Sequence, residues 1–93
     1  MEEIKTLHII VSGKVQGVYF RATCVDIACE MGIVGWVRNL PHRRVEIMAS
    51  GSPRKMNEFL KWCSKGPSEA NVDNVFIEEV SLQLFEKFTI LRS

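Results

Sequence analysis

The residues best suited to chemistry lie together in one segment, residues 12–21, which reads SGKVQGVYFR. Two glycines, Gly13 and Gly17, stand between an expected strand and the expected start of a helix. A turn of this kind can point consecutive backbone N–H groups in one direction, and the first turn of the helix adds unpaired amides and a positive dipole end. Such groups bind anions, phosphate above all. Arg21 follows directly, and its planar guanidinium can donate to two phosphate oxygens at once.

A second candidate is Asn39, which ends the segment GWVRN over residues 35–39. Its amide could order a water molecule, although an asparagine at the end of a strand often only begins a turn. The glycine segment also has a second interpretation, as a tight strand-to-helix turn that leaves Arg21 at the surface. It matches neither the GxxxxGK(S/T) nor the GxGxxG phosphate-binding motif. Spacing alone therefore leaves a functional and a purely structural interpretation open, both for the glycine segment with Arg21 and for Asn39.

The elements that would position these residues follow from hydrophobic spacing. Apolar residues recur at helical spacing from Phe20 to Met31, and alternation of apolar and polar residues over 44–50 indicates a strand. Gly32 marks the end of the first helix, and Pro53 marks the start of the second. The predicted elements are a strand over residues 6–12, a helix over 20–31, a strand over 33–39, a turn over 40–43, a strand over 44–50, a helix over 53–65, a loop over 67–74, and strands over 75–82 and 87–91.

This order predicts the fold class. Two helices with one apolar stripe each can cover one face of a sheet. The expected fold is therefore α+β, a ferredoxin-like βαββαβ sandwich with both helices on one face of a mostly antiparallel four- to five-stranded sheet. With 93 residues, the chain is expected to form a single domain over residues 1–93. The fold assigns no function, because it hosts many unrelated ones.

Composition narrows the function classes. Twelve Lys and Arg against eleven Asp and Glu give a net charge of +1, which argues against a dedicated nucleic-acid binder. No apolar stretch approaches the ~20 residues that span a bilayer, and the N-terminus lacks the pattern of a signal peptide, so we expect a cytoplasmic protein.

Cys24 and Cys29 would point apart on a helix and cannot hold one metal. With Cys63 they are expected to be reduced thiols.

The motif VQGVYFR over residues 15–21, joined to GWVRN over 35–39, resembles the acylphosphatase family. The resemblance implies hydrolysis of the carboxyl–phosphate bond of acyl phosphates, with no metal or organic cofactor. It implies that Arg21 binds the phosphate and that Asn39 orients the attacking water. The loop whose amides hold the phosphate would comprise Val15, Gln16, Gly17, Val18, Tyr19 and Phe20.

The resemblance also sets the expected partners. They are a small acyl phosphate as substrate and inorganic phosphate as product and inhibitor, without nucleic acid or membrane, and the chain is expected to be a monomer. Two departures from the family pattern stand out: His42-Arg43 replaces the usual Asp-Gly turn, and residues 91–93 lack a tyrosine. A hairpin at His42-Arg43 is expected to need positive φ there, which strains residues other than glycine.

Two alternatives remain beside this interpretation. One is a non-enzymatic binding module for an anion or RNA on the same fold. An RNA binder of this fold would show exposed aromatic residues on its two middle strands. These strands offer instead His8, Ile10, Glu46 and Met48. The other is a domain of a larger hydrogenase-maturation protein acting on carbamoyl phosphate, against which the chain length and the lack of zinc-finger cysteines argue.

Overall fold

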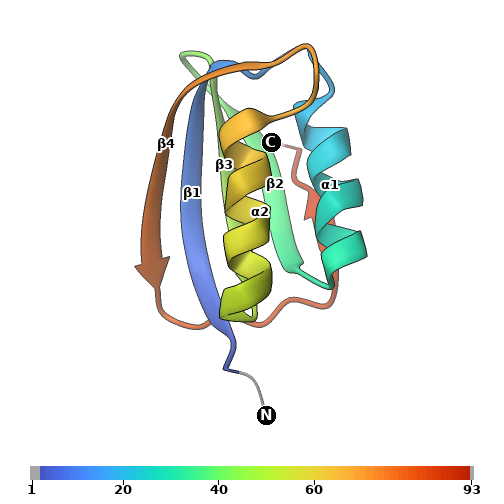
Figure 1. Ribbon diagram of the computed structural model, residues 1–93, viewed down its shortest axis with the longest axis vertical. Helices are drawn as coiled ribbons and strands as arrows, with labels where there is room; N and C mark the ends of the chain where they lie inside the picture. Colours follow the sequence, from blue (N-terminus) through green and yellow to red (C-terminus); the bar gives the residue numbers. More distant parts are fainter. Residues whose placement is uncertain (1–2, 93) are drawn as a thin grey trace.

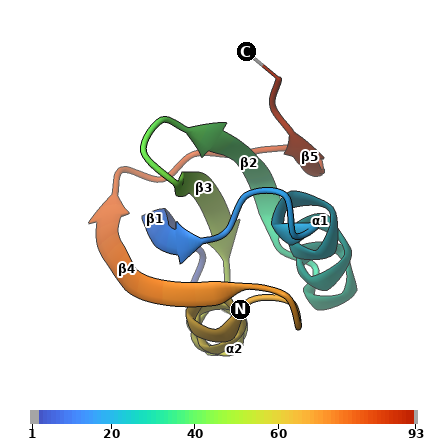
Figure 2. The same ribbon diagram turned by 90° about the horizontal axis from the view of Figure 1, so that it is seen from above.

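The computed structural model describes residues 3–92 as five strands and two helices. They are β1 (Lys5–Lys14), α1 (Phe20–Met31), β2 (Val34–Leu40), β3 (Arg44–Gly51), α2 (Pro53–Lys65), β4 (Asn71–Val80) and β5 (Phe88–Ile90). The strands form one sheet in the order β4-β1-β3-β2-β5, antiparallel except for the parallel pair β2 and β5. Both helices lie on the same face of this sheet (Figure 1), which curves around them (Figure 2). The predicted fold class is confirmed.

The core lies between the sheet and the two helices. Leu7, Ile9 and Val11 of β1 are buried, as the alternating pattern requires. The helices bury Phe20, Cys24, Ala28, Met56, Phe59 and Cys63. Burial raises the pKa of the Cys24 and Cys63 thiols, so both stay protonated at neutral pH. Within residues 3–92, no helix has the length and apolar character needed to cross a membrane.

Strand β4 departs from its predicted bounds of 75–82, because it begins at Asn71 and ends at Val80. The loop predicted over 67–74 is therefore wrong for its last four residues. β1 also runs beyond its predicted end to Lys14, after a register shift between Ser12 and Gly13, and its extension pairs with the start of β4. A Cβ on Gly13 would lie 2.3 Å from the Asn71 carbonyl oxygen, so only glycine allows this close approach.

The hairpin between β2 and β3 is strained, as expected. His42 has φ 65° and Arg43 has φ 58°, both in the left-handed region. Hydrogen bonds hold the turn in this conformation: the Gly13 N–H donates to the Arg43 carbonyl at 3.2 Å, and Arg44 Nε donates to the Pro41 carbonyl at 3.0 Å. The backbone strain is thus offset by contacts to β1 and within the turn.

Arg43→Gly should stabilise the protein by about 1 kcal/mol, because glycine removes most of the cost of the left-handed conformation. Denaturant unfolding would measure this as a higher midpoint at unchanged slope. Arg43→Ala is the matched control, since it removes the same side chain and keeps the Cβ. An equal gain for Arg43→Ala would mean that the side chain, and not the positive φ, destabilises the turn.

Glu46 joins three strands on the face of the sheet that the helices leave open. Its carboxylate accepts hydrogen bonds from Arg38 Nε on β2 and His8 Nε2 on β1, each at 2.6 Å. Burial acts to raise the pKa of Glu46, and the bonds from His8 and Arg38 outweigh it, so that the net pKa is lowered. A carboxyl with a lowered native pKa stabilises the folded state above its unfolded pKa.

Glu46→Gln should therefore lower the free energy of unfolding at pH 7 by about 1 kcal/mol. The difference from the wild type should shrink below about pH 4, as the native carboxyl becomes protonated. Urea unfolding of both proteins from pH 7 to pH 3 would test this. A difference that stays constant over that range would contradict an ionic role for Glu46.

Candidate active site

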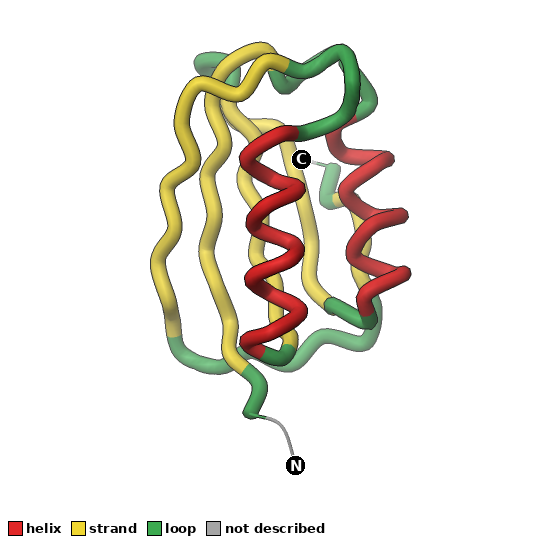
Figure 3. The backbone as a smooth tube through the Cα atoms, viewed as in Figure 1, coloured by secondary structure: helices red, strands yellow, loops and turns green. Residues whose placement is uncertain are grey.

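The loop between β1 and α1 and the turn between β2 and β3 lie at the same end of the sheet (Figure 3). At this end, the loop, the first turn of α1, the end of β2 and the end of β5 line one pocket. This pocket has a volume of about 390 Å³. Its lining consists of Val15, Gln16, Gly17, Tyr19, Phe20, Arg21, Ala22, Asn39, Ile90 and Arg92. The fold thus brings together every sequence-predicted site residue except Val18, whose side chain is buried in the core.

Two residues in the left-handed region shape the loop between β1 and α1. Gly17 has φ 74°, and Tyr19, which precedes α1, has φ 64°. Tyr19 provides no side-chain cap, but its carbonyl accepts the first helical hydrogen bond from the Thr23 N–H at 3.0 Å. The helix therefore begins with its free amides next to the loop.

A run of unpaired amides is the main feature of this loop. In the described part of the chain, no backbone hydrogen bond uses the N–H groups of residues 16–22. The Val15 N–H donates to the Gly13 carbonyl at 3.0 Å, so the run begins at Gln16, one residue later than expected. Val15 still lines the pocket, although its side chain is almost fully buried in the core. Consecutive free amides at a helix start form a concave site of positive partial charge.

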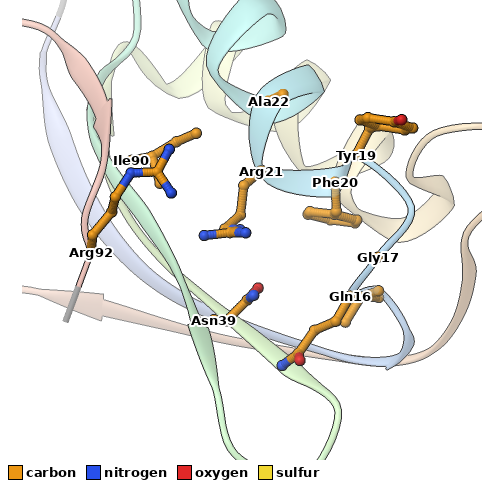
Figure 4. A pocket seen from close by; sticks show the side chains of 10 residues that line it. Gln16, Gly17, Tyr19, Phe20, Arg21, Ala22, Asn39, Ile90 and Arg92 are labelled. Atoms are coloured by element: carbon orange, nitrogen blue, oxygen red, sulfur yellow. The ribbon is translucent and has the colours of Figure 1, made fainter.

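The side chains of Arg21 and Asn39 face each other across the pocket (Figure 4). Arg21 extends from the first turn of α1, and within residues 3–92 it forms no ion pair. Asn39 extends from β2, and its Oδ1 is buried without a hydrogen-bond partner among the described residues. A buried acceptor without a partner is costly, so this oxygen is a natural place for a water molecule or ligand.

Gln16 ties the loop to the hairpin. Its Nε2 donates to the Leu40 carbonyl at 2.7 Å and to the Arg44 carbonyl at 2.9 Å. Because Leu40 follows Asn39 in the chain, these bonds hold the Asn39 strand against the loop of free amides. The motif predicted a role for the backbone of Gln16, whereas the side-chain bridge depends on a tertiary contact that spacing does not reveal.

Arg92 and Ile90 line the pocket and were not predicted. The parallel pairing of β5 with β2 places them there, and the Leu91 N–H extends this pairing by donating to the Val37 carbonyl at 2.9 Å. The pairing joins residues about fifty positions apart in sequence, which local patterns cannot indicate. Among the described residues, no acidic one is part of the lining, so the guanidinium groups of Arg21 and Arg92 make the pocket suited to anions. Within residues 3–92, His, Cys, Asp and Glu form no cluster of three that could bind a metal.

Comparison with known proteins gives a consistent result. A family model described as Acylphosphatase matches residues 7–90. An acylphosphatase of Marinobacter nauticus is 48% identical over 90 residues, which cover 97% of this chain and 96% of the relative. The structure of an acylphosphatase from Coxiella burnetii matches with a TM-score of 0.91 at 38% identity, covering 95% of this chain and 93% of its own. Full-length HypF, in a phosphate- and nucleotide-bound form, matches with a TM-score of 0.91 at 26% identity, and this chain spans 12% of its length. Because the family model extends from β1 to β5 and these acylphosphatases match over nearly their whole length, the chain belongs to the acylphosphatase family.

Proposed function

We infer that this chain is an acylphosphatase, which hydrolyses the carboxyl–phosphate bond of small acyl phosphates to a carboxylate and inorganic phosphate. Membership of the family supports this activity. The observation that carries the mechanism is the run of unpaired backbone amides over residues 16–22, to which Arg21 itself belongs. We further propose that the chain acts as a monomeric single domain, without nucleic acid or membrane, in the cytoplasm, where unpaired thiols such as the exposed Cys29 stay reduced.

The phosphoryl group would be held by the free amides and the Arg21 guanidinium. The transition state of phosphoryl transfer is loose, with negative charge spread over the phosphoryl oxygens. Preorganised N–H donors aimed at these oxygens stabilise that charge more than they stabilise the ground state. The leaving group is a carboxylate, which is stable as an anion, so a weakly activated water suffices as nucleophile. The site therefore needs no histidine or carboxylate base.

Asn39 would position the attacking water, because its buried Oδ1 lacks a partner among the described residues and can accept a hydrogen bond from that water. An amide does not take up a proton at neutral pH, so Asn39 is not a general base. The water oxygen forms a bond to phosphorus while the bond from phosphorus to the carboxyl oxygen breaks, and the electron pair leaves with the carboxylate. A phosphoryl oxygen takes the water's proton. Gln16 supports this geometry by holding the hairpin against the loop.

Arg21→Lys should nearly abolish both activity and phosphate binding, because lysine keeps the charge and loses the two parallel N–H donors. Phosphate at ~100 times its Kd should stabilise the wild type by about 2.7 kcal/mol, and this shift should vanish in the variant. Thermal melts with and without phosphate, together with benzoyl phosphate turnover, measure both effects. Arg43→Lys, at the exposed hairpin, is the matched control. An Arg21→Lys enzyme with wild-type kcat and KM would contradict the two-donor role.

Asn39→Ala should separate chemistry from binding. We expect kcat to fall by roughly 10²-fold or more, because removal of one well-placed polar group from an active site has an effect of this size. The affinity for phosphate should stay within a few-fold of the wild-type value. Asn39→Asp should be no better, since a carboxylate repels the phosphoryl charge. Steady-state kinetics and phosphate inhibition constants measure the two effects. Recovery of activity in Asn39→Asp would instead indicate a general base at this position.

A further inference from the structure

Arg92 lies at the active site without a part in the mechanism above. It lines the main pocket and also a smaller adjoining pocket of about 270 Å³, which Arg21, Asn39, Leu91 and Arg92 form. Figure 4 shows the guanidinium groups of Arg21 and Arg92 extending toward the same space, one from α1 and one from the segment after β5. Among residues 3–92, no acidic side chain lines either pocket and Arg92 forms no ion pair.

The charge of Arg92 exceeds what the phosphoryl group needs. Arg21 and the free amides of residues 16–22 already supply donors for the phosphoryl oxygens. Two guanidinium groups directed at one space repel each other unless an anion lies between or beside them. A second anionic group in the ligand would balance this second charge, and a guanidinium binds a carboxylate through two parallel hydrogen bonds.

The shared pocket brings the acyl part of the substrate within reach of Arg92. Attack is in line, so the leaving oxygen lies opposite the attacking water. The water would be held by the buried Oδ1 of Asn39, so the leaving oxygen lies on the far side of the phosphoryl group from that atom. The acyl group therefore extends from the phosphoryl group into a pocket whose lining includes both Arg21 and Arg92.

We propose that Arg92 is a specificity-determining residue, which favours acyl phosphates whose acyl part carries a second anionic group. This proposal rests on the proposed function, since it assumes that the phosphoryl group occupies the loop. It goes beyond that function by naming a subclass of substrate and the side chain that selects it. The second anion contacts Arg92 and takes no part in bond breaking.

Two substrates of nearly equal shape test the proposal: 4-carboxybenzoyl phosphate, which carries the second anion, and 4-carbamoylbenzoyl phosphate, which is its neutral counterpart. The quantity measured is the ratio of their kcat/KM values. In the wild type we expect the carboxylate to be preferred by about fivefold to tenfold, and less at high salt. Arg92→Gln should bring the ratio close to one, and Arg92→Lys should retain part of the preference. Lys61→Gln is the matched control, because it removes the same charge from the exposed face of α2 and should leave the ratio at its wild-type value.

Three results would overturn the proposal: no preference in the wild type, an unchanged ratio in Arg92→Gln, or an equal loss in Arg92→Gln and Lys61→Gln. An unchanged ratio with a lower rate on both substrates would place Arg92 on the phosphoryl group. A wild-type enzyme that hydrolyses neither substrate, nor benzoyl phosphate, would overturn the proposed function itself. Failure of the specificity proposal is therefore distinguishable from failure of the function.

Discussion

The contact between the β1–α1 loop and the β2–β3 hairpin is the constraint on which the active site depends. The loop carries the free amides and leads into Arg21, while the hairpin follows Asn39. Two hydrogen bonds from the Gln16 side chain, to the carbonyls of Leu40 and Arg44, join these two parts. The Gly13 N–H adds a third link, to the Arg43 carbonyl. Because the proposed reaction depends on in-line alignment of water and phosphorus, a displacement of one part against the other by about 1 Å would cost much of the rate.

Backbone strain is concentrated at the same end of the molecule. The described residues other than glycine with positive φ are Tyr19, His42 and Arg43, and all three lie in the loop or the hairpin. Such residues cost of order 1–3 kcal/mol each and persist only where surrounding contacts hold them. Here the contacts are hydrogen bonds between the two strained segments, with the buried sheet and helices beneath them. At Tyr19 the strained backbone turns the chain into α1, so that the free amides lie beside Arg21.

The fold could be predicted because its signals are local, whereas the roles of Arg21 and Asn39 were inferred from the resemblance of their motifs to the acylphosphatase family and stay predictions. Helical spacing from Phe20 onward and alternation over residues 44–50 depend on which face of each element is buried. The positive φ at His42 and Arg43 also followed from the short connection between two strands.

The start of β4 was missed because polar residues such as Asp73 occupy an edge strand, where alternation is weak. Arg92 and the side-chain role of Gln16 were missed because both arise from tertiary contacts, the β2–β5 pairing and the loop–hairpin bridge.

Hydrolysis of acetyl phosphate in ¹⁸O-labelled water tests most directly whether the site directs water to phosphorus. The loop amides and Arg21 would hold the phosphoryl group, and Asn39 would hold the water in line with it. Mass spectrometry of the products should then find one ¹⁸O atom in the inorganic phosphate and none in the acetate, at a rate well above that of the enzyme-free reaction. Label in the acetate would mean that water attacks the acyl carbon, which would contradict the roles given to the loop, Arg21 and Asn39.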